Sequence, residues 1–121
     1  VPHYMYRMDH AYKRHRYWLP PGQELSKLPS EYFREHIYTT FQDDWIAFKM
    51  VEHVNHERLL WANDFPHSDS TWPWSQEMLD EHAASLTDVQ AKDILCDNAA
   101  ELYEINLAAL PVGGDSLAAT V

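Results

Sequence analysis

Hydrophobic and polar positions switch between helix-like and strand-like spacing along the chain, and these switches define a series of short elements. Residues 4–18 have helical spacing, and the breaker Leu-Pro-Pro-Gly at 19–22 predicts where that helix ends. Residues 19–29 form a linker bounded by prolines. Ser30 is predicted to cap a short turn before a strand over 36–41, which is rich in β-branched and aromatic side chains.

The middle of the chain continues this alternation. Residues 43–54 carry apolar side chains at a helical period behind two acids, and residues 58–63 indicate a second strand. A loop over 64–73 follows, and another helix is expected to begin near Trp74. A strand joined through a helix to a further strand predicts a right-handed parallel crossover. Because both faces of a parallel sheet are covered, we expect further elements on either side of this unit.

Two capping patterns mark the helices that follow. Thr87 and Gln90 form a T-x-x-Q capping box for a helix over residues 88–95, and Asn98 with Glu101 offers a similar arrangement for the next one. Both patterns satisfy backbone N–H groups that a helix leaves unpaired at its start. The sequence therefore predicts two separately capped helices here.

The domain organisation follows from the length and the composition. With 121 residues, 45% of them hydrophobic, the chain has enough apolar material for one modest core. We expect a single unit over residues 1–110 and a disordered tail over 111–121. The chain lacks an initiating Met and begins within a helical pattern, so we expect it to be part of something longer.

Charge and cysteine content exclude some classes of function. The formal net charge of −10 argues against nucleic acid or an anionic membrane as a partner, because both need a basic surface. The basic cluster at 12–18 is balanced by acids elsewhere, which leaves a small binding patch as the alternative. Cys96, the single cysteine, suits a reducing compartment and is expected to be a small core residue. No stretch has the length of a membrane span or the pattern of a signal peptide, so a cytoplasmic location is the default.

The most informative chemistry follows the second predicted strand, in the stretch LLWANDFPHSDSTWP over 59–73. In a parallel α/β fold the carboxyl ends of the strands hold the active site, and Asp64 stands at that end. A carboxylate there can bind a divalent metal, orient water or accept a proton, and the alternative is a loop or helix cap. His67 could contact substrate or support a metal ligand.

Other candidates have simpler explanations. His53 and His56 form H-x-x-H, which can bind metal, but helix C-terminal capping and dipole contacts explain them more easily. Asp43 or Asp44 is expected to cap the helix that follows. Packing at a helix entry is expected to account for Trp72 and Trp74, and a polar loop for residues 69–71.

A family resemblance adds what spacing alone cannot supply. The stretches RLLWANDFPHSDSTWPWSQEML and ILCDNAAELY together resemble the C-terminal signature of the amidohydrolase-related metal-dependent hydrolases. This family includes aminocarboxymuconate-semialdehyde decarboxylase and γ-resorcylate decarboxylase. The segment PSEYFREHIYTTFQDD resembles the part that precedes the signature, so the resemblance covers roughly residues 4–106.

The resemblance implies an α/β fold, the C-terminal part of a (β/α)8 TIM barrel, a class in which about 250 residues are typical. Residues 36–41 and 58–63 then resemble the seventh and eighth strands. Asp64 matches the family's metal-associated catalytic carboxylate, and His67 matches a histidine that shapes the site, contacting substrate or supporting a residue that does. The implied cofactor is a divalent ion, zinc in the first place, and the implied partner is a small-molecule substrate, with a homo-oligomer possible for the parent protein.

One departure from the family pattern matters. The H-x-H motif that supplies the family's main metal ligands is absent from this sequence. A catalytic zinc needs about three protein ligands, so we expect no tight metal binding by this chain alone and no activity from it. The leading hypothesis is a C-terminal portion of a hydrolase or decarboxylase acting on small carbonyl or carboxylate compounds. The alternative is a non-catalytic truncated chain that acts through protein–protein association.

Overall fold

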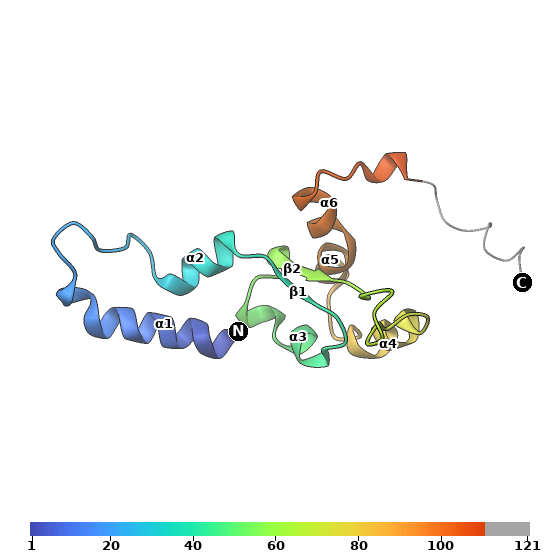
Figure 1. Cartoon of the computed structure of the whole chain (residues 1–121), viewed down its shortest axis with the longest axis horizontal. Helices are drawn as coiled ribbons and strands as arrows, with labels where there is room; N and C mark the ends of the chain where they lie inside the picture. The colour runs from blue at the N-terminus through green and yellow to red at the C-terminus, as the bar shows by residue number, and fades with distance from the viewer. Residues whose placement is uncertain (111–121) are drawn as a thin grey trace, which may run out of the picture.

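A two-stranded parallel sheet lies at the centre of the fold, as the sequence predicts. The computed structural model describes residues 1–110, in which β1 (Thr39–Phe41) pairs with β2 (Leu59–Trp61) from Thr39↔Leu59 to Phe41↔Trp61 (Figure 1). Each strand has three residues and is shorter than its predicted range. The first position of the predicted strand, His36, belongs to the preceding helix, and residues 37–38 lie between that helix and β1.

The crossover between the strands is a short helix followed by two 3-10 turns. The helix α3 (Trp45–Lys49) is followed by η2 (Val51–His53) and η3 (His56–Arg58) before β2 begins. Asp44 caps α3, as expected, because its Oδ1 accepts a hydrogen bond from the Ala47 amide at 3.2 Å. The single helix predicted over 43–54 is therefore correct in position and too long.

The hydrophobic core lies between this crossover, β2 and the C-terminal helices. Its buried members are Phe48, Val51, Leu59 and Ile94. The ring of Phe41 packs edge-to-face on that of Phe48 with centroids 4.9 Å apart. Burial of a large apolar side chain contributes about 1.5–3 kcal/mol, so a core this small makes every contact with β2 important.

The C-terminal part of the chain is helical. The first capping box is confirmed: Thr87 Oγ1 accepts from the Gln90 amide at 3.3 Å, and Gln90 Oε1 accepts from the Thr87 amide at 3.0 Å. The elements in this part are α4 (Ser75–His82), α5 (Asp88–Lys92), the π-helical η4 (Asp93–Asp97), α6 (Asn98–Leu102) and the 3-10 turn η5 (Leu107–Ala109). The predicted disordered tail over 111–121 lies outside the described residues.

The second capping pattern is wrong, because Asn98 lies inside a continuous run of helical residues. The run passes from α5 through η4 into α6 without a break in helical backbone angles. Asn98 is 4% exposed, and its Nδ2 donates to the carbonyls of His56 at 2.6 Å and Leu59 at 2.8 Å. The side chain therefore anchors the helix to the start of β2.

Cys96 is exposed, so its prediction as a core residue is also wrong. The π-helical turn that contains it directs Ile94 into the core, where that side chain is 1% exposed. A residue two positions further along a helix lies near the opposite side, which places Cys96 in solvent. Helical spacing alone could not decide which of these residues would be inside.

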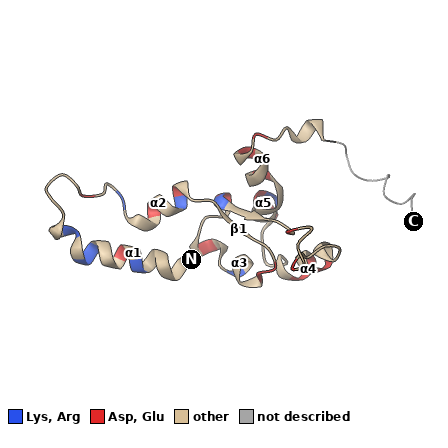
Figure 2. Cartoon of the chain, in the orientation of Figure 1, with Lys and Arg blue, Asp and Glu red and all other residues tan. Residues whose placement is uncertain are grey.

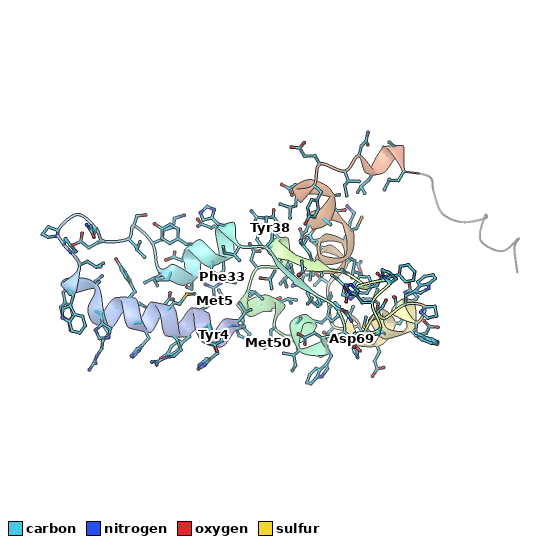
Figure 3. All side chains as sticks on the ribbon, in the orientation of Figure 1. Tyr4, Met5, Phe33, Tyr38, Met50 and Asp69 are labelled. Atoms are coloured by element: carbon cyan, nitrogen blue, oxygen red, sulfur yellow. The ribbon has the colours of Figure 1, made fainter. Side chains whose placement is uncertain are left out.

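A pair of helices extends from the sheet to one side (Figure 1). The helix α1 (Pro2–His15) ends in a 3-10 turn, η1 (Arg16–Trp18), and packs along α2 (Pro29–His36). Met5, which is 2% exposed, and Phe33 lie between the two helices (Figure 3). This arrangement confirms the predicted helix and its end before the proline-rich breaker.

Ser30 joins the two helices and does not cap the second. The N-cap of α2 is Leu28, whose amide donates to Glu31 Oε2 at 2.7 Å. Ser30 is buried, and its amide and hydroxyl donate to the Asp9 carboxylate at 2.8 and 2.7 Å.

Basic side chains are spread along α1, while acids gather near α4 (Figure 2). None of the helices within residues 1–110 is long and apolar enough to cross a membrane.

We expect Asn98→Ala to lower the free energy of unfolding by about 2 kcal/mol, because two buried carbonyls lose their donor. Glu101→Ala changes an exposed side chain of the same helix and should stay within about 0.5 kcal/mol of wild type. Urea unfolding of the intact protein measures both values. Equal stability of the two variants would show that Asn98 does not anchor β2.

The exposed pair of Lys27 and Glu35 gives a pH-dependent prediction. Lys27 Nζ lies 2.6 Å from Glu35 Oε1, and this hydrogen bond lowers the pKa of Glu35 below its ordinary value of 4.5. Because the folded-state pKa is lowered, the stabilisation is fully present above pH 4.5 and disappears as the pH falls through that folded-state pKa. Lys27→Met should return the Glu35 pKa toward its ordinary value in a ¹³C NMR titration, and an unmoved pKa would contradict the pairing.

Candidate functional site

The candidate site is built on the loop that leaves β2. Asp64 stands three positions after Trp61, the last residue of β2, and its backbone has a positive φ of 60°. Asp and Asn adopt this left-handed conformation more readily than other residues with a Cβ. The backbone therefore turns sharply at Asp64 immediately after the strand exit.

Asp64 and His67, the two site residues expected from the sequence, are in contact. His67 Nδ1 lies 2.9 Å from Asp64 Oδ1, and the His67 amide donates to the Asp64 carbonyl at 3.0 Å. The Asp64 side chain is 41% exposed and that of His67 is 74% exposed. The result is a solvent-accessible carboxylate–imidazole pair at the carboxyl end of the sheet.

The loop between Asn63 and Thr71 is closed by its own hydrogen bonds. The Asn63 carbonyl accepts from Ser70 Oγ at 2.7 Å and from the Thr71 amide at 3.1 Å. Asn63 Oδ1 also accepts from the Phe65 amide at 3.1 Å. These bonds span the segment that carries Asp64, so its shape is set locally. The polar loop expected from Asp69, Ser70 and Thr71 thus has a specific structural role.

A hollow of about 280 Å³ lies at the carboxyl ends of the two strands. Asp64 borders it from β2, and Gln42 borders it from β1. Gln42 was not predicted from the sequence, because the pattern of adjacent acids, Asp43 and Asp44, indicates only a helix cap. Its position directly after a predicted strand was the available signal. The remaining lining residues are Thr40, Phe41 and Ala62.

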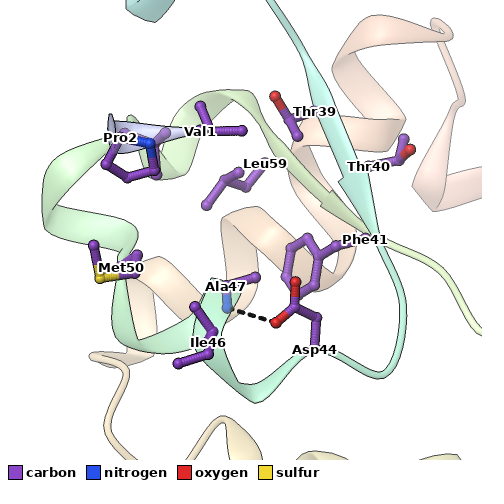
Figure 4. Close-up of a pocket in the computed structure, with 11 residues that line it drawn as sticks. Val1, Pro2, Thr39, Thr40, Phe41, Asp44, Ile46, Ala47, Met50 and Leu59 are labelled. Carbon is purple, nitrogen blue, oxygen red and sulfur yellow. Dashed lines mark hydrogen bonds between the residues drawn. The ribbon is translucent and has the colours of Figure 1, made fainter. Parts of the chain in front are cut away.

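Phe41 also borders a second hollow, of about 290 Å³, which is more apolar (Figure 4). Leu59, Ile46 and Met50 contribute to its wall. The carboxylate that borders it, Asp44, is already used to cap α3. Asp64 does not line this hollow, so the hollow is distinct from the Asp64 site.

The H-x-x-H residues do not form a shared site. His56 Nδ1 lies 2.9 Å from Asp93 Oδ2 of η4, and His53 occupies the last turn of η2. Asp43 Oδ1 lies 3.6 Å from His82 Nδ1. Each imidazole–carboxylate contact joins the crossover to a different helix, so these residues link elements of the fold.

Three aromatic side chains lie exposed beside the site. Phe65 and Trp72 pack edge-to-face with centroids 6.2 Å apart, and both are more than half exposed. Trp74 is 67% exposed. The expectation that packing accounts for Trp72 and Trp74 is wrong within the described part of the chain.

The residues present do not make a complete metal site. Within residues 1–110, His, Cys, Asp and Glu side chains form no group of three that could hold an ion. Asp64 fits the chemistry of one ligand, and its Oδ1 already contacts Nδ1 of its neighbour His67. A tightly held ion would need further donors from outside these residues.

Comparison with known proteins agrees with this geometry. A family model described as amidohydrolase matches residues 2–105, so the chain belongs to the amidohydrolase family. No curated protein matches the chain. The family resemblance drawn from the stretches RLLWANDFPHSDSTWPWSQEML and ILCDNAAELY is therefore confirmed.

The fold is also similar to that of a solved enzyme structure. The crystal structure of 2,6-dihydroxybenzoate decarboxylase complexed with 2,6-dihydroxybenzoate matches with a TM-score of 0.52 at 19% sequence identity. The match covers 86% of this chain and 31% of that chain. At this identity the likeness shows the fold: two parallel strands and flanking helices, as in part of an amidohydrolase TIM barrel. The chain thus spans about a third of its neighbour's length.

The left-handed backbone at Asp64 predicts a difference between two substitutions. Asp64→Asn should keep stability within about 0.5 kcal/mol, since Asn tolerates a positive φ. Asp64→Val should cost about 1–2 kcal/mol more, because a β-branched residue is strained there. Thermal unfolding of both variants in the intact protein measures the difference, and equal midpoints would rule out the strain.

Proposed function

We propose that this chain carries the carboxylate-bearing part of the active site of a metal-dependent hydrolase or carboxy-lyase. The substrates are small carbonyl or carboxylate compounds. The observation that supports this most directly is the position of Asp64. Its Oδ1 lies 2.9 Å from His67 Nδ1, beside a hollow at the carboxyl ends of two parallel strands. Parallel α/β enzymes hold their reacting groups at this end.

Asp64 is proposed to act as a proton relay. One carboxylate oxygen is engaged by His67 Nδ1, which orients the group and leaves the second oxygen for a reacting proton. In hydrolysis, Asp64 would take a proton from water as that water attacks a carbonyl, and then return it to the leaving group. In decarboxylation, the protonated Asp64 would give its proton to the carbon from which carbon dioxide departs.

The cofactor proposed for the complete site is a divalent ion, with zinc as the first choice. Asp64 would be one ligand, and the others would come from outside residues 1–110, because those residues lack a group of three donors. When bound, such an ion polarises a carbonyl or carboxylate oxygen. What the described residues contribute is the carboxylate, its orientation by His67 and the shape of the loop.

The first substrates to examine are aromatic carboxylates. The solved neighbour is a decarboxylase bound to 2,6-dihydroxybenzoate, and Phe65 and Trp72 provide aromatic surface next to Asp64. A cytoplasmic location and self-association of the parent protein are part of the same proposal. The location rests on the single cysteine, which suits a reducing compartment, and self-association is carried over from the family resemblance.

A second candidate function is non-catalytic association with another protein. The exposed rings of Phe65, Trp72 and Trp74 favour it, since aromatic side chains are enriched at interfaces. The two functions differ in what Asp64 does. Association through the rings would be insensitive to removal of one carboxylate charge.

In the complete parent protein that contains this chain, Asp64→Asn should reduce turnover by at least about a hundredfold. That factor is the usual contribution of a positioned acid or base. Release of carbon dioxide is measured across a panel of small aromatic carboxylates, and hydrolysis is measured on the corresponding esters. Circular dichroism should show unchanged secondary structure, because Asn fits the left-handed backbone.

Asp69→Asn is the matched control for this experiment. Asp69 is an exposed acid of the same loop, and the hydrogen bond that the structure gives it uses its carbonyl. Its substitution should leave turnover within about twofold of wild type, as for surface changes. Full activity in Asp64→Asn would end the proton-relay proposal, and inactivity of wild type on the whole panel would favour the association function.

A further inference from the structure

Gln42 occupies the position where β1 ends and the site loop comes closest to it. Its carbonyl accepts hydrogen bonds from Trp61 Nε1 at 3.1 Å and from the Asp44 amide at 3.1 Å. One of these donors belongs to β2 and the other to the entry of α3. The backbone of Gln42 is therefore held from both sides, which fixes the direction in which its side chain leaves the strand.

The side chain of Gln42 reaches the site loop. Its Nε2 donates to the carbonyl of Asp69, a contact that joins residues 27 positions apart. The next residue, Ser70, bonds back to the Asn63 carbonyl, and the loop between them is closed on itself. A hydrogen bond that fixes Asp69 therefore also restrains the closed loop that carries Asp64.

Gln42 and Asp64 also border the same hollow, from opposite strands. We infer that Gln42 is a positioning residue, which fixes the Asp64 loop against the end of β1 through the Asp69 carbonyl. The catalytic part of this inference rests on the proposed function of Asp64. The positioning itself can be tested without any turnover.

The chemistry of the contact requires an amide at this length. A glutamate has the same shape as glutamine but is acceptor-only when ionised, so it would repel the Asp69 carbonyl. An asparagine keeps the donor but is one methylene shorter, so it loses the reach. Gln42→Glu and Gln42→Asn therefore remove the same contact for different reasons, and agreement between them identifies the contact as the cause.

Hydrogen exchange in the intact protein tests the positioning. Amide exchange over residues 67–72 should become about tenfold faster in both variants, the factor for loss of one hydrogen bond. Exchange over α5 and α6 should not change, because Asn98 anchors that region independently. Gln23→Glu makes the same chemical change in the exposed proline-bounded linker and should leave the loop at its wild-type rate.

A second readout connects the positioning to catalysis. Once a substrate has been found for the wild-type protein, Gln42→Glu should lower kcat about tenfold and leave KM within about twofold. The reason is that the loop positions Asp64 and does not bind the substrate. A rise in KM at unchanged kcat would make Gln42 a substrate-binding residue and overturn the inference.

The outcomes separate this inference from the proposed function. Unchanged exchange over residues 67–72 in Gln42→Glu overturns the positioning, whatever Asp64 does. Faster exchange throughout the chain also overturns it, because the effect is then global destabilisation. Faster exchange confined to the loop, together with full activity in Asp64→Asn, supports the positioning while the proton-relay proposal fails.

Discussion

The buried carboxamide of Asn98 is the interaction on which the rest of the structure depends. It donates to the carbonyls of His56 and Leu59, and so joins the C-terminal helices to the first residue of β2. A three-residue strand has few ladder bonds of its own, so its position relies on such anchors. With β2 held at its start, the core around Phe48 and Ile94 closes over it.

The other end of β2 is organised by a different set of bonds. Trp61 donates to the Gln42 carbonyl, and the Asn63 carbonyl closes the loop through Ser70 and Thr71. Polar groups of the loop therefore satisfy one another, which lets a structured turn stand in solvent at a strand end. The loop that these bonds shape places His67 Nδ1 2.9 Å from Asp64 Oδ1 at the end of the strand.

Membership of the amidohydrolase family explains why so much polar chemistry is concentrated at one strand exit. The chain corresponds to about a third of the length of the barrel it resembles. A barrel builds its site from many strand ends, so each strand contributes only one or two groups. Asp64 is our proposed contribution of this chain, and the loop that surrounds it is already formed within the described residues.

The sequence by itself determined the order and type of the elements. Periodicity, the breaker at 19–22, the cap at Asp44 and the capping box at Thr87 are local signals, and each was read correctly because neighbours in sequence produce it. The position of Asp64 at a strand end also followed from the chain order. These signals were sufficient to predict parallel pairing and the candidate carboxylate.

Only the tertiary structure decided which side chains joined distant elements. Asn98 and Ser30 resemble helix caps in sequence, yet one bonds to β2 and the other to Asp9, because burial gave them partners far along the chain. Gln42 belongs to no recognisable sequence motif. Its contact with Asp69 forms only because the ends of β1 and β2 lie side by side in the folded chain. Long-range partners are set by packing, and packing is not encoded in any short stretch.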